Sequence, residues 1–195
     1  ILNRAGEIIL RTGRAIASGE EPGTFDPPVI LNPNAPATAI AFAQTGTGPS
    51  VAAINRNSDL VSLYRLDNLD APVTLATAAG PTRMAVGDLN DDGWDDIAVA
   101  MAGSGVVQVF DGRADGSFDV EGATELGTDA SHPAQNAPSD FLIEDTNGDD
   151  LLDLLVADRT AATVTIFENE GNGVFSHSGR FAVGSGPSVV QPTAD

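Results

Sequence analysis

Two short segments of the chain carry oxygen-donating side chains at alternate positions. Asp88–Asp96 and Asp145–Asp153 each begin Asp-x-Asn-x-Asp and end in Asp. Side chains at alternate positions of a tight loop point inward together, and calcium prefers six to eight such oxygens. Five carboxylates fall within the nine residues of the first segment, and they would repel one another without a cation. We call these segments acidic loop 1 (88–96) and acidic loop 2 (145–153) and predict that both bind Ca²⁺.

In acidic loop 1, Asp88, Asn90 and Asp92 are expected to supply side-chain oxygens. Trp94 would add its backbone carbonyl, and Asp96 would close the site. Gly93 allows the sharp turn that such a loop needs. Acidic loop 2 has Asp150 in place of this glycine. Because Asp tolerates left-handed backbone better than most residues, acidic loop 2 is predicted to bind calcium more weakly.

Two alternatives compete with this interpretation. An EF-hand needs Glu at position 12 and flanking helices, but position 12 is Val99 or Val156 and the flanks are typical of strands. Solvated Asp/Asn turns between strands are common. The same donor set at the same point of two repeats argues against that interpretation.

The repeat is ungapped between residues 84–118 and 141–175, at an offset of 57 residues. Weaker copies flank it, and prolines open the successive units at Pro36, Pro81, Pro138 and Pro187. Each unit contains four short strands: two apolar runs, expected to be buried on both faces, then an alternating strand and a less apolar edge strand. Four strands in about 50 residues are typical of a β-propeller blade.

The predicted fold is all-β: a β-propeller of four-stranded antiparallel blades, about three of them full, with partial blades at both ends. We expect one domain or segment over residues 1–195, with units at about 1–34 (partial), 35–78, 79–134, 135–182 and 183–195 (partial). It is interpreted as a segment of a larger propeller. In the alternative, residues 1–33 and 183–195 complete one blade of a four-bladed ring. Asp195 stands where a further first ligand would fall. In the 35–78 unit Gln44 replaces the first Asp, and no metal is predicted there.

The acidic loops, with the segment Gly87–Ala100 and the trailing Asp115–Phe118, resemble the FG-GAP/VCBS repeat family, which includes the integrin-α propeller. The likeness covers most of the chain and is strongest over residues 80–175. It implies a β-propeller, typically of seven blades, with calcium between the first two strands of a blade. The implied ligands are Asp88, Asn90, Asp92, the Trp94 carbonyl and Asp96, and Asp145, Asn147, Asp149, the Leu151 carbonyl and Asp153.

Composition excludes several kinds of partner. The chain has 28 acidic and 9 basic residues, for a net charge of −19. Nucleic acids and anionic membranes require clustered Lys and Arg, so neither is expected as a partner. The absence of cysteine rules out disulfides and zinc–thiolate sites. The apolar runs are too short for membrane insertion.

No catalytic function is predicted. The two histidines, His132 and His177, lie in segments that resemble solvated loops, and no motif links either to a nucleophile. The calcium is expected to be structural, because an all-protein oxygen site between two strands leaves little room for substrate. Binding is expected on the face formed by the loops, of which 11–24 and 119–140 are long.

Trp94 could stack on a sugar ring, although packing against the neighbouring blade is the simpler interpretation. Tyr64 is expected to pack between blades. We therefore predict a secreted or cell-surface, calcium-stabilised module for adhesion or lectin-like binding of a protein or carbohydrate, with further blades or copies completing a ring. The alternatives are a building block of a surface assembly and a non-catalytic accessory propeller of a larger secreted enzyme.

Overall fold

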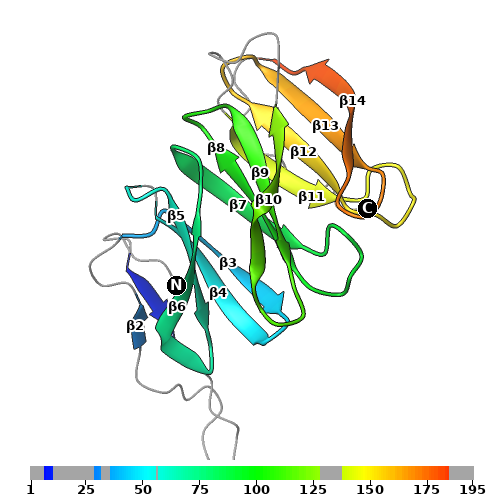
Figure 1. Ribbon diagram of the computed structural model, residues 1–195. Helices are drawn as coiled ribbons and strands as arrows, with labels where there is room; N and C mark the ends of the chain where they lie inside the picture. The colour runs from blue at the N-terminus through cyan, green and yellow to red at the C-terminus, as the bar shows by residue number, and fades with distance from the viewer. Residues whose placement is uncertain (1–6, 11–28, 32–35, 56, 128–137, 185–195) are drawn as a thin grey trace, which may run out of the picture.

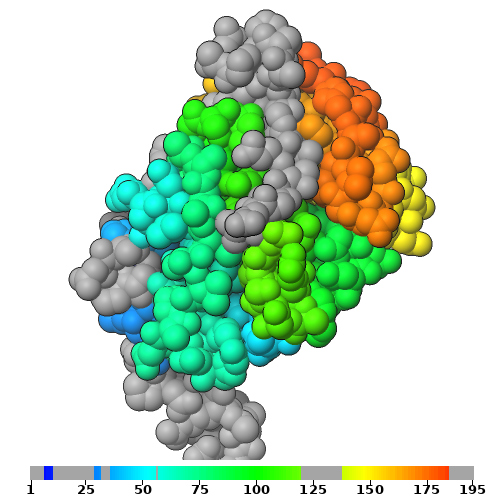
Figure 2. Space-filling view, in the orientation of Figure 1, coloured from blue at the N-terminus to red at the C-terminus, as the bar shows by residue number. Residues whose placement is uncertain are grey.

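The computed structural model describes residues 7–10, 29–31, 36–55, 57–127 and 138–184. Within these residues it contains three four-stranded antiparallel sheets, each with its strands in sequence order, and one two-stranded pair. Figure 1 shows the three sheets side by side, each rotated relative to the one before it, and the space-filling view in Figure 2 shows the same succession from cyan through green to orange. The first sheet consists of β3 (Ala39–Thr45), β4 (Gly48–Asn55), β5 (Leu60–Arg65) and β6 (Asn68–Ala76). The second consists of β7 (Pro81–Gly87), β8 (Asp96–Met101), β9 (Val106–Gly112) and β10 (Phe118–Gly127). The third consists of β11 (Pro138–Glu144), β12 (Asp153–Asp158), β13 (Thr163–Asn169) and β14 (Phe175–Ala182). The separate two-stranded pair consists of β1 (Ile8–Leu10) and β2 (Val29–Leu31).

The prediction of an all-β chain of four-stranded antiparallel units is confirmed, and each sheet falls inside one predicted unit. No helix among the described residues is long and apolar enough to cross a membrane.

The apolar second strands are buried on both faces, as predicted. All six residues of β8 are buried, because alternate side chains point to opposite neighbouring sheets. Ile97, Val99 and Met101 pack against the first sheet. Ala98 and Ala100 pack toward the third. An uninterrupted apolar run is therefore what this strand requires.

The first strands are less buried than the sequence predicts. Residues of β3, β7 and β11 are mostly half-exposed, and the Phe42 side chain is 69% exposed. Each first strand ends its own sheet and has a hydrogen-bonded neighbour on one side only. The neighbouring first strands lie beside it, with β7 between β3 and β11, so that it is only partly covered.

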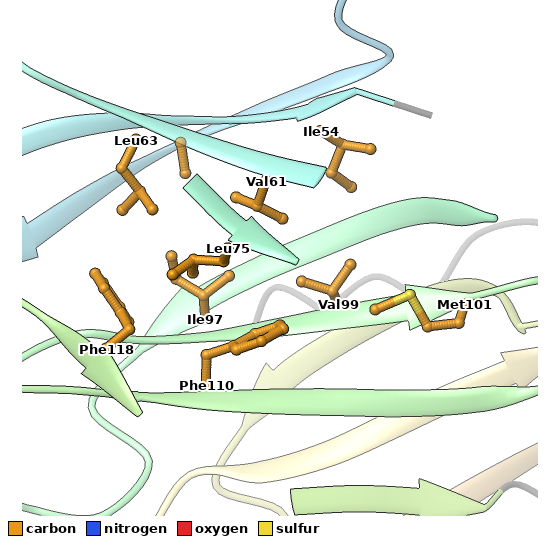
Figure 3. Close-up of a cluster of buried hydrophobic side chains, with 10 residues drawn as sticks. Ile54, Val61, Leu63, Leu75, Ile97, Val99, Met101, Phe110 and Phe118 are labelled. Carbon is orange, nitrogen blue, oxygen red and sulfur yellow. The ribbon is translucent and has the colours of Figure 1, made fainter. Parts of the chain in front are cut away.

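The core lies between sheets rather than within one. Between the first and second sheets, residues from both interdigitate around Phe110, which is fully buried (Figure 3). A second cluster around Leu154 joins the second and third sheets. Tyr64 packs with Ile8 and Leu31, which fixes the two-stranded pair against the first sheet and confirms the predicted packing role. Apolar burial at these faces is what holds consecutive sheets together.

The turn between β9 and β10 also reaches back to the preceding sheet. A Cβ atom added to Gly116 would lie 2.3 Å from Thr47 Oγ1 in the β3–β4 turn. Only glycine permits so close an approach. The third–fourth strand hairpin of one sheet thus lies against the first–second strand connection of the sheet before it.

Two local expectations differ from the structure. The expected long loop 119–140 is shorter, since β10 runs to Gly127 and β11 starts at Pro138. His177 lies in β14 rather than in a loop, with its ring edge-to-face on Phe167 at 5.9 Å. Within the N-terminal unit, predicted as a partial blade over about residues 1–34, β1 pairs with β2. The predictions for loop 11–24, His132 and Asp195 concern residues outside the described ranges.

Candidate metal centre

Both acidic loops connect the first strand of a sheet to its second. Acidic loop 1 joins β7 to β8, and acidic loop 2 joins β11 to β12. The register pairs Gly87 with Asp96 and Glu144 with Asp153, so the ninth residue of each loop is the first residue of the second strand. The ladder therefore anchors this Asp while the preceding eight residues form the loop.

In acidic loop 1 the side chains of the first three predicted ligands accept hydrogen bonds from backbone N–H groups of the same loop. The Asp92 N–H donates to both Asp88 Oδ1 (3.1 Å) and Asn90 Oδ1 (3.0 Å). The Gly93 N–H donates to Asp88 Oδ2 at 2.8 Å, and the Trp94 N–H to Asp92 Oδ1 at 2.9 Å. The structure thus brings the Asp88 and Asn90 oxygens together on one amide.

Asp96 lies behind these residues and is not exposed. Its Oδ2 accepts the Leu89 N–H at 2.9 Å, and its Oδ1 accepts the Gly112 N–H at 2.7 Å. The pKa of Asp96 is raised to about 7, mainly because burial disfavours the charged carboxylate; the two amide hydrogen bonds oppose this rise, and the negative charges of Asp111 and Asp92 add to it. A buried carboxylate with acidic neighbours gains stability from any cation that reaches it.

Acidic loop 2 repeats this arrangement. Asp145 accepts hydrogen bonds from the N–H groups of Gly148 (2.7 Å) and Asp150 (3.0 Å). These bonds lower the pKa of Asp145, and the bond from Gly148 has the largest effect. Asn147 Oδ1 accepts the Asp149 N–H at 2.9 Å. The Leu151 N–H donates to Asp149 Oδ1 at 2.9 Å, as that of Trp94 does to Asp92. Asp153, not exposed, accepts the N–H groups of Thr146 and Asn169, both at 2.9 Å.

Acidic loop 2 was expected to bind calcium more weakly because it lacks the turn glycine at position 150. The backbone shows that it has a glycine at its other left-handed position. In acidic loop 1 the left-handed residues are Asp91 (φ 61°) and Gly93 (φ 88°). In acidic loop 2 they are the equivalent Gly148 (φ 83°) and Asp150 (φ 69°). Each loop places one Asp and one Gly at the same two left-handed positions, in opposite order. The glycine has moved within the loop and has not been lost.

The two loops differ more clearly in what covers them. A Cβ atom added to Gly173, in the β13–β14 turn, would lie 3.6 Å from the Asn90 Cβ, so the third sheet lies over acidic loop 1. Asn90 is half-buried, whereas its equivalent Asn147 is exposed. On its other side, acidic loop 1 contacts the first sheet, where the Asp95 N–H donates to the Gln44 carbonyl at 3.2 Å and Asp95 Oδ2 accepts the Gln44 N–H.

Among the residues that the structure describes, no three His, Cys, Asp or Glu side chains are arranged around a common point as they would be around a metal ion. The carboxylates instead accept the loops' own N–H groups. Two of the five predicted ligands in each loop are an amide side chain and a backbone carbonyl.

Sequence reasoning assigned no specific contact to three residues in or near the loops. Asp111 is a half-buried carboxylate on β9 whose pKa is raised by burial first and then by Asp119 and Asp92. Asp95 joins acidic loop 1 to the first sheet. Asn169 reaches acidic loop 1 from the third sheet. Asp111 could have been found, because in a meander the end of the third strand lies beside the start of the second.

Two other residues considered from the sequence, Trp94 and Gln44, lie at first–second strand connections. Trp94 is half-buried within acidic loop 1. Gln44 and Thr45 end β3 at a two-residue turn, where Thr45 Oγ1 donates to the Gly48 carbonyl at 2.8 Å.

No family model and no curated protein sequence matches this chain. Among solved structures it is similar to BBS1N in a complex with ARL6DN that was soaked with mercury, with a TM-score of 0.55 and 15% sequence identity. The match covers 83% of this chain and 45% of that one, so this chain spans less than half the length of its neighbour. The shared fold is a β-propeller. The three four-stranded sheets are blades of that fold, and at this identity the likeness concerns the fold alone.

Proposed function

We propose that acidic loops 1 and 2 each bind Ca²⁺ and that the ions stabilise the blades of an extracellular binding module. The observation that carries this proposal is the repetition of the loop at the level of backbone and hydrogen bonds. Both loops have the same two left-handed positions, and both bury their ninth residue beside the third strand. A pair of solvated turns would have no reason to share all these features.

The donor set suits calcium. In acidic loop 1, Asp88, Asn90, Asp92 and Asp96 offer oxygens, and Trp94 adds a carbonyl; calcium accepts this mixture, whereas zinc favours nitrogen and sulfur. Asp111 adds a carboxylate that raises the local negative charge, since it acts on the pKa of Asp96. Bound calcium would neutralise these groups and replace their mutual repulsion with attraction.

The proposed role of the ion is to hold acidic loop 1 in place between the two neighbouring blades. Acidic loop 1 contacts the first blade through Gln44 and the third through Gly173, so fixing the loop would fix both contacts. A ligand that binds only the folded state adds about 1.4 kcal/mol for each tenfold excess over its dissociation constant. Extracellular calcium modules bind at about 10⁻⁴–10⁻³ M, which gives roughly 0.4–1.4 kcal/mol per site at about 1 mM calcium.

Recognition of a protein or carbohydrate partner is assigned to the loop face of the blades, at the cell surface or in the secreted state. Propellers present loops from several blades on one face, and a calcium clamp would hold these loops in a fixed relation. The neighbouring structure, BBS1N with ARL6DN, is a complex between proteins.

The test is the melting temperature of the protein in millimolar CaCl₂ and in EGTA, with MgCl₂ as the ionic-strength control. We expect calcium to raise the melting temperature by about 1–6 °C per site, because about 1 kcal/mol corresponds to about 2–4 °C in a domain of this size. The response should fall by half or more with Asp88→Asn and Asp92→Asn, which together silence acidic loop 1. Identical melting temperatures in calcium and EGTA would reject the proposal.

A further inference from the structure

Asn169 connects the two acidic loops. It is the last residue of β13, and only 3% of its surface is exposed. Its side-chain Nδ2 donates to the Leu89 carbonyl of acidic loop 1 at 2.7 Å and to the Leu152 carbonyl of acidic loop 2 at 3.1 Å. Its backbone N–H donates to Asp153 Oδ1 at 2.9 Å, and its Oδ1 accepts the Gly171 N–H at 2.9 Å. Both amide protons and the amide oxygen are therefore used in a buried position, where losing a partner is costly.

The connection continues to the buried carboxylate of acidic loop 1. Leu89 accepts the Asn169 bond through its carbonyl and donates its N–H to Asp96 Oδ2 at 2.9 Å. A chain of hydrogen bonds thus runs from Asp96 through the Leu89 backbone and Asn169 to Asp153. These two Asp residues are the ninth positions of the two loops, and both are fully buried. Hydrogen bonds in such a low-dielectric chain strengthen one another.

The equivalent position in the second blade shows what the side chain adds. Gly112, 57 residues before Asn169, donates its N–H to Asp96 Oδ1 just as Asn169 donates to Asp153. The backbone role is therefore common to both blades. A Cβ atom at Gly112 would lie 2.3 Å from the Asp95 carbonyl oxygen, so this position cannot carry an amide. The link between loops is a specific feature of the third blade.

We infer that Asn169 is a positioning residue that couples the two calcium sites, so that calcium in one loop raises the affinity of the other. This inference rests on the proposed function, because both loops must bind the ion. Calcium in acidic loop 2 would fix Asp153 and, through it, Asn169 and the Leu89 carbonyl. Acidic loop 1 would then lose less conformational freedom when it binds its own ion, which is positive cooperativity. Linkage requires the effect to be equal in both directions.

The sole tryptophan lies in acidic loop 1, so terbium luminescence sensitised by Trp94 reports occupancy of that loop, and calcium competition gives its affinity. Four proteins form a cycle: the unaltered chain, a chain with acidic loop 2 silenced by Asp145→Asn and Asp149→Asn, Asn169→Ala, and the combination. Silencing acidic loop 2 should weaken calcium binding at acidic loop 1 about fivefold. In the Asn169→Ala background the same silencing should leave that affinity unchanged. An equal weakening in both backgrounds would overturn the coupling.

Ser176→Ala is the matched control, since it removes the Ser176–Glu170 hydrogen bond of the same hairpin and touches neither loop. It should preserve the fivefold effect. If Asn169→Ala unfolds, hydrogen exchange of the Leu89 amide in the folded chains provides the answer: silencing acidic loop 2 should speed it in calcium, and an unchanged rate contradicts the inference. Absence of calcium binding by calorimetry in the unaltered chain would instead reject the proposed function itself.

Discussion

At the scale of single residues, left-handed backbone defines the acidic loops better than any one side chain. The fourth and sixth positions of each loop have positive φ, occupied by Asp91 and Gly93 in one and by Gly148 and Asp150 in the other. A position-by-position comparison of sequences finds a missing glycine at Asp150. The backbone shows that each loop contains one glycine for two strained positions. The strain at the other position falls on Asp, which tolerates it.

Gly148→Ala should therefore destabilise the protein by about 1–2 kcal/mol, because an L-residue pays this in left-handed backbone. No atom lies within 4 Å of the Cβ position at Gly148, so the cost is conformational and not steric. Urea unfolding in EGTA measures it. Gly184→Ala is the control, since it is equally open but not left-handed, and it should be close to neutral. Equal effects of the two substitutions would contradict the strain argument.

The buried carboxylate of Asp96 should make the calcium-free protein less stable as pH rises. The pKa of Asp96 is raised from its ordinary value of 3.8 to about 7 in the folded state, so the folded protein binds the proton more tightly than the unfolded chain. Stability from this group is greatest below the unfolded pKa and declines between about pH 4 and 7, by at most about 1.4 kcal/mol per pH unit. Denaturation in EGTA across this range tests it.

Two comparisons isolate Asp96 in that experiment. Asp96→Asn should flatten the slope between about pH 4 and 7, whereas Asp115→Asn should not. Asp115 is exposed, and its pKa is lowered by hydrogen bonds from Ser117, so its contribution is lost only at more acidic pH. Calcium should also flatten the slope, because a cation favours the carboxylate. A slope that survives in Asp96→Asn would assign the titration to another group.

At the scale of elements, the strands, their period and the burial of the second strands were predictable, and the exposure of the first strands was not. The 57-residue offset and the apolar run of β8 indicated four-stranded units, because repeats and apolar patterns can be read directly from the order of residues. The exposure of Phe42 depends on which strand ends the sheet, and that is a property of the assembled sheets. The acidic loops were recognisable from spacing alone. Asn169 was not, since blade packing brings it to acidic loop 1 from 80 residues further along the chain.

Packing between blades should dominate stability at this scale. Phe110 is fully buried between the first and second sheets, so Phe110→Ala should cost about 3–5 kcal/mol through lost burial and the cavity left behind. Phe181, on β14, is 55% exposed, and Phe181→Ala should cost less than about 0.5 kcal/mol. Chemical denaturation at fixed calcium compares the two. A similar cost for both would mean that the sheets do not share the core seen in Figure 3.

At the scale of the whole molecule, charge is the dominant feature. A net charge of −19 on 195 residues means that acidic groups lie close to one another over much of the surface. Ion pairs such as Arg65–Asp67 and Arg113–Asp119 are exposed or half-exposed, and pairs of this kind contribute little. The folded state therefore concentrates negative charge, and two different effects relieve it: general screening by salt and specific calcium binding.

These two effects should separate in a salt titration of the melting temperature. In EGTA, raising NaCl from about 0.1 M to about 1 M shortens the Debye length from about 10 Å to about 3 Å, and we expect a gradual rise of about 2–4 °C without saturation. Calcium should act at millimolar concentration and saturate, because its sites fill. A chain silenced in both loops by Asp88→Asn, Asp92→Asn, Asp145→Asn and Asp149→Asn should keep most of the NaCl response and lose the saturable calcium response. If that chain still shows saturable stabilisation by calcium, the ion acts elsewhere on the acidic surface. If NaCl reproduces the full calcium effect in the unaltered chain, relief of repulsion explains the stabilisation without bound ions.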